Sequence, residues 1–216
     1  MKILFEGDSI TDAGRDRSDP HGMGNGYPKY ASELIRARAQ VRAEANGRAF
    51  EEPEFWNFSI SGSRSEHLLG RLENMIALQP DFISILIGVN DVWHRHSATN
   101  PVPTTDEQFE ANYRRVLEAV KTRTHAKLLM LEPFLLDVPD KLRMRPELIR
   151  IIEINRALAR EYADAYLPLD GLFTAAEIAA REKNVYSADG VHPNPTGAQF
   201  IAEHYLRAAA PLLETL

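Results

Sequence analysis

Ser9 is the first residue of the chain whose type and position suggest covalent chemistry. It follows a short apolar run, within Gly7-Asp8-Ser9-Ile10. A serine on a tight turn between a strand and a helix projects its hydroxyl at the carboxyl edge of a sheet, where the amide hydrogens of the turn can also face an oxyanion. Ser9 could instead only cap a short helix, because Ser9-x-x-Asp12 resembles a capping box. The segment alone leaves both roles open.

A serine nucleophile requires a general base, and the base requires a group that orients it. Both residue types occur near the other end of the chain, in the segment 189–193 with the sequence Asp-Gly-Val-His-Pro. The spacing of three residues places the carboxylate of Asp189 and the imidazole of His192 on the same side of a turn. Asp189 can then hold the proton of one ring nitrogen while the other nitrogen faces Ser9. The segment could also serve as an Asp-Gly turn ahead of a helix, and the two interpretations are compatible.

Two further segments contain groups that could donate hydrogen bonds to an oxyanion. Gly62, in Ser-Ile-Ser-Gly-Ser at 59–63, lacks a β-carbon, so its amide can approach a substrate oxygen closely. Asn90, in Gly-Val-Asn-Asp at 88–91, offers a neutral side-chain amide. Taken singly, a glycine at the start of a helix and an asparagine in a turn are the simpler explanations.

The elements that would position these residues alternate between strand and helix. Short apolar runs predict five strands that are buried on both faces, at 3–5, 55–60, 82–87, 128–131 and 166–169. Apolar residues at helical spacing predict six helices, at 27–45, 65–78, 105–122, 146–162, 174–183 and 195–213. The alternation predicts an α/β fold in one domain over residues 1–216, with a five-stranded parallel sheet between two layers of helices in the flavodoxin-like arrangement.

In such a fold the four candidate segments meet. They follow the first three strands and lie beyond the fifth, so all of them reach the carboxyl edge of the predicted sheet, where α/β folds bind ligands. Two long loops, at 11–26 and 88–104, leave strands at the same edge. A third long loop, at 133–145, contains the apolar sequence Phe-Leu-Leu and could cover a pocket or contact a second subunit. The combination predicts a hydrolytic serine site.

Composition narrows the remaining classes of function. The 216 residues include 25 Lys and Arg against 31 Asp and Glu, a formal net charge of −6 without a block of five like charges, so we expect no nucleic-acid partner. No apolar stretch reaches the length of a membrane span, and Glu6 interrupts the N-terminus too early for a signal peptide, so we expect a cytoplasmic protein with no membrane partner. The absence of cysteine excludes thiolate ligands and a cysteine nucleophile. His94-x-His96 lacks a cluster of further ligands, so we expect no metal.

Together the four segments resemble those of the SGNH, or GDSL, hydrolases. The four letters correspond to Ser9, Gly62, Asn90 and His192, which occur in the family's order and at similar spacing across nearly the whole chain. The resemblance implies a serine esterase that needs no metal or organic cofactor. In it Ser9 would attack the ester carbonyl, His192 would carry the proton, and Asp189 would orient His192. The oxyanion hole would consist of the amides of Ser9 and Gly62 and the side chain of Asn90.

A narrower similarity is to the intracellular bacterial acetylxylan esterases of this superfamily. It comes from Gly-Asp-Ser-Ile-Thr-Asp-Ala-Gly-Arg at 7–15, Ile-Gly-Val-Asn-Asp-Val-Trp at 87–93 and Leu-Glu-Pro-Phe at 131–134. One departure is Ser59, where such proteins often have the first glycine of Asn-x-Gly-x-x-Gly. The departure affects only the local path of the strand, because the glycine of the oxyanion hole is present.

This similarity implies the hydrolysis of acetyl esters on xylo-oligosaccharides or related sugars by a homo-oligomeric enzyme. Trp93 would form a wall of the pocket, and Asp8 and Arg15 are further candidates for contact with substrate. Arg15 could instead anchor the loop at 11–26. Two alternatives remain. A lysophospholipase, thioesterase or arylesterase of the same superfamily would need a pocket for a different acyl group. An inactive carbohydrate-binding protein would bind acetylated sugar without hydrolysing it.

Overall fold

A five-stranded sheet forms the centre of the protein in the computed structural model, which describes residues 1–97, 103–182 and 184–216. Its strands are β1 (Lys2–Gly7), β2 (Glu54–Asn57), β3 (Phe82–Leu86), β4 (Lys127–Leu131) and β5 (Ala165–Leu167). They lie in the order β2-β1-β3-β4-β5, and every pair of neighbours is parallel. This is the strand order of the flavodoxin-like fold, so the predicted fold class is confirmed.

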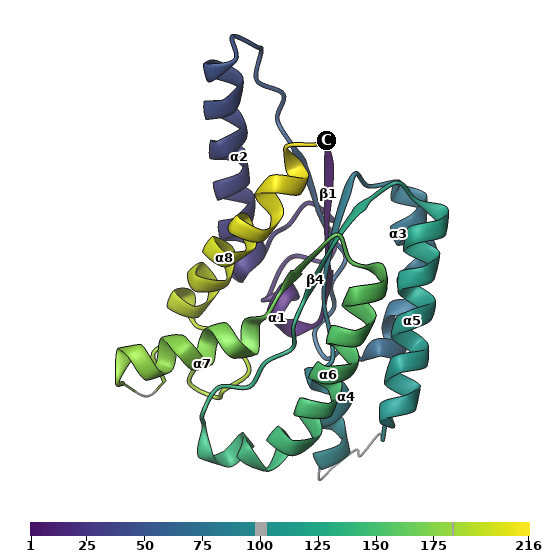
Figure 1. Ribbon diagram of the computed structural model, residues 1–216, viewed down its shortest axis with the longest axis vertical. Coiled ribbons are helices and arrows are strands. Elements are labelled where there is room, and N and C mark those ends of the chain that lie inside the picture. Colours follow the sequence, from purple (N-terminus) through teal and green to yellow (C-terminus); the bar gives the residue numbers. More distant parts are fainter. Residues whose placement is uncertain (98–102, 183) are drawn as a thin grey trace.

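Helices cover both faces of the sheet (Figure 1). On one face α2 (Tyr27–Ala45) packs against α8 (Pro195–Leu213), and on the other α5 (Asp106–Arg123) packs between α3 (Ser65–Leu78) and α6 (Arg145–Tyr162). The short helices α1 (Ser9–Asp12) and α4 (Val89–Trp93) directly follow β1 and β3, at the carboxyl edge of the sheet. Three elements complete the chain: the 3-10 helices η1 (His94–His96) and η2 (Pro139–Met144), and α7 (Leu169–Ala180).

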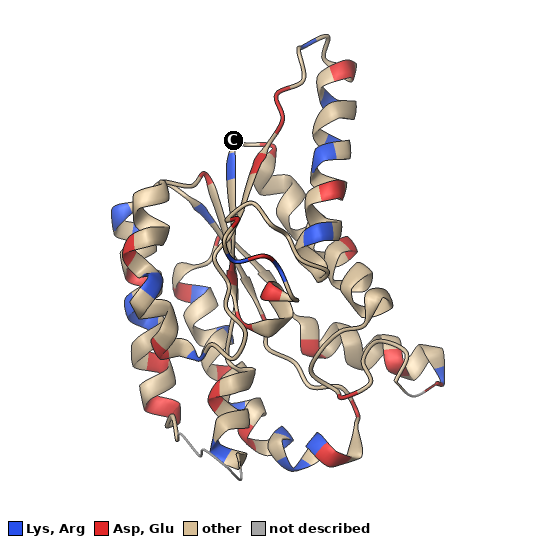
Figure 2. Cartoon of the chain, turned by 180° about the vertical axis from the view of Figure 1, so that it is seen from behind, with Lys and Arg blue, Asp and Glu red and all other residues tan. Residues whose placement is uncertain are grey.

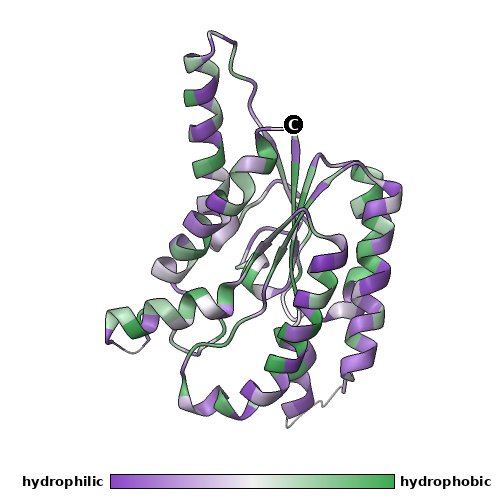
Figure 3. Cartoon of the chain, in the orientation of Figure 1, coloured by the Kyte–Doolittle hydropathy of each residue, from purple (hydrophilic) through white to green (hydrophobic). Residues whose placement is uncertain are grey.

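The distribution of apolar side chains explains these layers. Every residue of β3 is buried, as expected for a central strand that packs helices on both faces. Figure 3 shows apolar residues concentrated in the strands and on parts of the helices, whereas Figure 2 shows the charged residues spread mainly over helices and loops. Within the described ranges, no helix is both long enough and apolar enough to cross a membrane.

Local signals fix where several helices begin and end. The Thr105 hydroxyl accepts a hydrogen bond from the amide of Gln108 at the start of α5, and the Thr105 amide donates one to Oε1 of the Gln108 side chain. Asn194 caps α8, and Pro195 follows it as the first helical residue. These signals are local in sequence, so the predicted bounds of such helices agree with the structure to within one residue.

Two predicted elements differ from the structure. The strand expected at 55–60 ends at Asn57, because the Asn57 side chain accepts hydrogen bonds from the amide and hydroxyl of Ser59 and turns the chain. The helix expected at 174–183 begins at Leu169 and ends at Ala180, and its predicted last residue lies outside the described residues. Its first turns contain polar and small residues, which obscured the helical spacing of buried Leu169 and Phe173. The short helices α1, α4, η1 and η2 were not predicted, since a few residues show no periodicity.

A buried ion pair connects the end of β1 to α3. Glu6 is fully buried, and its carboxylate accepts hydrogen bonds from the Gly7 amide and from the guanidinium of Arg71, at 2.8 and 2.7 Å. Arg71 also donates to the hydroxyl of Ser63 and the carbonyl of Gly7. The pair therefore holds two loops at the carboxyl edge of the sheet in register.

We expect Arg71→Met to lower the free energy of unfolding by about 3–5 kcal/mol, because it leaves the Glu6 carboxylate buried without its counter-ion. Urea unfolding followed by circular dichroism measures the change. Arg123→Met is the matched control: its partner Glu73 is exposed, so the decrease should be far smaller. Adding Glu6→Gln to Arg71→Met should recover part of the loss. Equal losses for Arg71→Met and Arg123→Met would contradict the interpretation.

Candidate active site

The turn between β1 and α1 presents Ser9. Gly7 ends the strand at a close approach of backbones, where a β-carbon would lie 2.5 Å from both the Leu86 carbonyl oxygen and the Thr11 hydroxyl. Asp8 is the N-cap of α1 and accepts a hydrogen bond from the amide of Ile10. Ser9 is then the first helical residue, with its side chain partly exposed.

The alternative role of Ser9, a capping box with Asp12, does not form, because Asp8 occupies the capping position. The carboxylate of Asp12 turns the other way and accepts hydrogen bonds from the amide and hydroxyl of Ser61, both at 2.7 Å, and from Arg17. Asp12 thereby ties α1 to the loop that follows β2. The hydroxyl of Ser9 is left free of any capping role.

Ser9, His192 and Asp189 form one chain of hydrogen bonds. The Oγ of Ser9 lies 2.9 Å from Nε2 of His192, and Nδ1 of His192 lies 2.7 Å from Oδ2 of Asp189. A carboxylate only accepts hydrogen bonds, so Nδ1 carries the proton and Nε2 is free to accept from Ser9. Residues separated by more than 180 positions in the sequence thus meet at the edge of the sheet.

Backbone amides hold the Asp189 carboxylate in place. Its Oδ1 accepts hydrogen bonds from the amides of Val191 and His192, at 2.9 and 2.8 Å, and from the hydroxyl of Ser187. Gly190 completes the turn with a φ of 83°, a value that disfavours residues with a β-carbon. This leaves Oδ2 for the imidazole, as the spacing of three residues predicts.

The pKa of Asp189 is lowered and the pKa of His192 is raised, as a general base and the carboxylate that orients it require. Partial burial would raise the pKa of Asp189, but hydrogen bonds from His192 and Val191 outweigh it and hold that pKa well below its usual range. The hydrogen bond to Asp189 raises the pKa of His192, with partial burial opposing it. Asp189 is therefore ionised at neutral pH, and His192 is a stronger base than free imidazole.

The two candidate donors of the oxyanion hole, Gly62 and Asn90, lie on loops that are tied together. Asn90 is on α4, and its Nδ2 donates a 3.1 Å hydrogen bond to the carbonyl of Ser63, the residue after Gly62. Gly62 has a φ of 80°, and the position that a β-carbon would take is open. Asp91 holds the same loop, since its carboxylate accepts from the amide and hydroxyl of Ser65. One of the two Nδ2 hydrogens of Asn90 remains for another acceptor.

Two of the three predicted substrate contacts, Asp8 and Arg15, have hydrogen-bond partners within the protein. Asp8 is fully buried, so its carboxylate faces the inside of the α1 turn and not the solvent. Burial raises the pKa of Asp8 to about 7, while the hydrogen bond from Ile10 opposes the shift. Arg15 donates to the carbonyl of Ser59 from Nε and Nη2, at 3.2 and 3.1 Å, and so anchors the loop at 11–26 to the end of β2.

Trp93 does border the triad. It stands on α4, three residues after Asn90, and its ring centroid lies 5.9 Å from that of His192. In the loop at 133–145, the apolar side chains of Phe134, Leu135 and Leu136 are buried, each at most 2% exposed. The amide of Leu136 donates to the carbonyl of Gly190, so this loop supports the turn that contains His192.

His94 and His96 are the first and last residues of η1. His96 contacts Glu147 at 2.8 Å, and Arg95 between them contacts Asp106 and Glu147, which fastens η1 to α5 and α6. No group of three potential ligands occurs in the part of the chain that the structure describes. The residues 98–102 of the loop expected at 88–104 lie outside the described residues.

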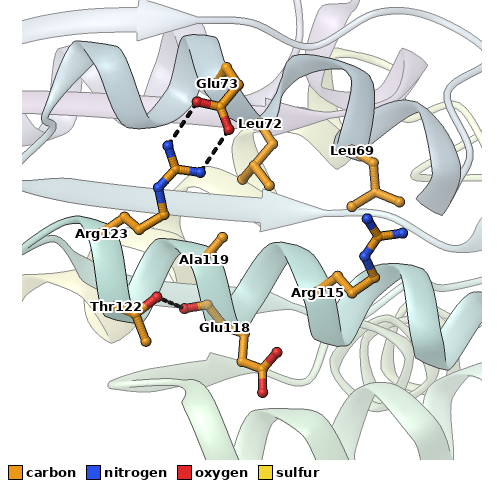
Figure 4. A pocket seen from close by; sticks show the side chains of 8 residues that line it. All are labelled: Leu69, Leu72, Glu73, Arg115, Glu118, Ala119, Thr122 and Arg123. Carbon is orange, nitrogen blue, oxygen red and sulfur yellow. Dashed lines mark hydrogen bonds and ion pairs between the residues drawn. The ribbon is translucent and has the colours of Figure 1, made fainter.

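A surface hollow between α3 and α5 lies away from these residues (Figure 4). Its volume is about 540 Å³, and the ion pair of Arg123 and Glu73 closes one end. None of its eight lining residues belongs to the triad or to the loops around it: Leu69, Leu72, Glu73, Arg115, Glu118, Ala119, Thr122 and Arg123. This hollow is therefore separate from the candidate active site.

The structure adds one neighbour of the triad that the sequence analysis missed. Lys141, in η2, places its Nζ 4.2 Å from the centroid of the Trp93 ring. No motif marks this lysine, because it stands 48 positions from Trp93 in a loop of mixed composition. Only the path of the loop across the sheet edge brings the two side chains together.

Known proteins share this fold and part of this sequence. Residues 5–200 match the GDSL-like lipase/acylhydrolase family. An acetylxylan esterase from Geobacillus stearothermophilus is 31% identical over 223 residues, which cover 95% of this chain and 92% of that protein. A crystal structure of an acetylxylan esterase from the same organism superimposes with a TM-score of 0.82 at 27% identity, covering 95% and 92% of the two chains. A protein described as a GDSL-like lipase from Parabacteroides merdae gives 0.83 at 31% identity, covering 97% and 95%.

Proposed function

The chain belongs to the GDSL-like lipase/acylhydrolase family and is a carboxylic ester hydrolase, and we propose that it removes acetyl groups from xylo-oligosaccharides or related sugars. The observation that carries the proposal is the hydrogen-bonded chain from Ser9 through His192 to Asp189. The similarity to an acetylxylan esterase over 95% of the chain supports the choice of acyl group.

In the proposed reaction the hydroxyl of Ser9 attacks the carbonyl carbon of the acetyl ester, and Nε2 of His192 takes the hydroxyl proton. The C–O bond to the sugar then breaks, and His192 gives the proton to the departing sugar oxygen. A water molecule attacks the acetyl-serine with His192 again as base. Acetate leaves and Ser9 regains its proton.

Three donors would stabilise the negative oxygen that develops in both steps. They are the amides of Ser9 and Gly62 and the free Nδ2 hydrogen of Asn90. The Asn90 side chain is only 7% exposed and is held by Ser63, so it needs little reorganisation to meet an oxyanion. Asp189 keeps His192 in the tautomer that accepts the Ser9 proton and stabilises the imidazolium once it forms.

The acyl group is tested with 4-nitrophenyl esters from acetate to decanoate, using the Ser9→Ala variant as the blank. We expect the Ser9-dependent kcat/KM to fall at least about tenfold beyond propionate, because the proposed pocket accepts an acetyl group and Trp93, beside His192, would form one of its walls. A maximum at hexanoate or longer would assign the enzyme to lipid or thioester substrates. Tight binding of an acetylated sugar without Ser9-dependent turnover would assign it to carbohydrate binding.

A further inference from the structure

Lys141 is a cationic side chain near the triad. Its ammonium group lies over the ring of Trp93, which in turn lies beside the imidazole of His192. Its charge reaches the imidazole, because it lowers the pKa of His192 against the larger upward effect of Asp189. The side chain thus stands at the border of the candidate active site.

This ammonium is not neutralised by the protein. In the part of the chain that the structure describes, Lys141 forms no ion pair with a carboxylate, and its contact is the face of Trp93. A cation over a ring at a partly exposed site is held by about 0.5–1 kcal/mol. Such a contact keeps the charge near the site and still lets it turn toward an anion.

The segment that bears Lys141 is fixed at both ends. Leu136 donates its amide to the carbonyl of Gly190, inside the turn between Asp189 and His192. At the other end Arg145 forms an ion pair with Asp170 at 2.7 Å. The amide of Lys141 itself bonds to the carbonyl of Val138. The backbone that bears Lys141 is therefore held beside the turn that contains His192.

Asp189 and Asp8, the two carboxylates that act on the His192 imidazole, do not pair with the Lys141 ammonium. Asp189 is bonded to His192, and Asp8 is buried beneath the nucleophile turn. A protein with a net charge of −6 thus presents an unpaired cation at the edge of its triad. An anionic substrate would be attracted to this cation beside the triad.

We propose that Lys141 makes this enzyme select acetyl esters whose alcohol portion carries a carboxylate, as a sugar substituted with a uronic acid does. The proposal rests on the proposed deacetylation and adds the charge of the preferred substrate. The carboxylate pairs with the ammonium of Lys141 while the uncharged part of the sugar packs against Trp93. The acetyl group then lies against Ser9.

The test compares two aryl acetates of nearly equal shape, the anion 4-acetoxybenzoate and the neutral 4-acetoxybenzamide. The quantity measured is the ratio of kcat/KM for the anion to kcat/KM for the amide, at low ionic strength. We expect Lys141→Met to lower this ratio by about five- to tenfold and Lys141→Glu to lower it further, since one removes and the other inverts a nearby unit charge. Lys141→Arg should keep the ratio.

Two controls separate this effect from others. Lys29→Met removes another lysine that lies over an aromatic ring, that of Tyr30 on α2, and should leave the ratio unchanged. In 1 M salt, where charges are screened beyond about 3 Å, the difference between the wild-type protein and Lys141→Met should shrink.

A ratio that is the same in the wild-type protein, Lys141→Met and Lys141→Glu would overturn the proposal about Lys141. That result leaves the proposed deacetylation intact as long as the neutral amide is hydrolysed in a Ser9-dependent manner. Absence of Ser9-dependent hydrolysis of both esters would instead refute the proposed function itself. A preference for acidic over neutral acetylated xylo-oligosaccharides, lost in Lys141→Met, would extend the result to sugars.

Discussion

Ser9→Ala is expected to lower kcat for 4-nitrophenyl acetate by about 10⁴–10⁶-fold, because no other group in the site can form the acyl intermediate. The oxyanion donors and the substrate contacts remain in the variant, so a small residual rate above that of water should persist. Steady-state hydrolysis at saturating ester measures the effect. Retention of more than about a tenth of the wild-type rate would sink the assignment of Ser9 as nucleophile.

Two companion variants make this result specific. Ser18→Ala removes an exposed hydroxyl from the following loop, where it bonds only to Asp16, and should leave kcat unchanged. The double variant Ser9→Ala with His192→Ala should be little slower than Ser9→Ala alone, because the two residues act as one unit. Multiplied losses in the double variant would show that His192 acts independently of Ser9.

The fold was predictable because the sequence patterns that indicate strands and helices are local and recur along the chain. Five apolar runs and the helical spacing between them specify a parallel sheet, and the bounds of α2, α3 and α8 agree with the structure. The disagreements come from single side chains and mixed composition, which blur the apolar pattern at the end of an element. Asn57 ends β2 through its own side chain, and α7 begins at Leu169, where the predicted strand ended.

The candidate site was predictable as far as motif and topology define it. Ser9 and His192 lie far apart in the sequence, yet parallel strands bring their loops to one edge, where they are 2.9 Å apart. Their catalytic roles stay predictions, as do the single domain over 1–216, the cytoplasmic location and the homo-oligomeric state. The buried pair of Glu6 and Arg71 and the position of Lys141 could not be predicted, since each depends on a contact between segments without a shared motif.

Asp8 shows why residue type alone misplaces a role. An acidic residue beside a nucleophile suggests contact with substrate, but the N-terminus of α1 needs an acceptor for its free amides. Asp8 supplies that acceptor through Oδ1, and no donor lies within hydrogen-bond distance of Oδ2 among the described residues. The capping residue is therefore Asp8, one residue before Ser9, which the sequence analysis considered for that role.

Asp189→Asn is expected to lower kcat by about 10⁴-fold while leaving the fold intact. The asparagine keeps an Oδ1 acceptor for the amides of Val191 and His192, so the turn should persist. Its amide nitrogen, however, replaces the Oδ2 that accepts from Nδ1 of His192. The favoured imidazole tautomer then carries its proton on Nε2 and cannot take the proton of Ser9.

The pH profile distinguishes this loss of orientation from a general loss of stability. Asp189 raises the pKa of His192, and activity requires the neutral imidazole, so kcat/KM of the wild-type protein falls as the pH drops through that pKa. Removing the carboxylate lowers the pKa of His192, and the acid limb of the residual Asp189→Asn activity should therefore shift to lower pH. Asp137→Asn, which removes an exposed carboxylate from the loop at 133–145, should change neither kcat nor the pH at which kcat/KM falls on the acid side. An Asp189→Asn profile with an unmoved acid limb would mean that Asp189 is not coupled to the ionisation of the base.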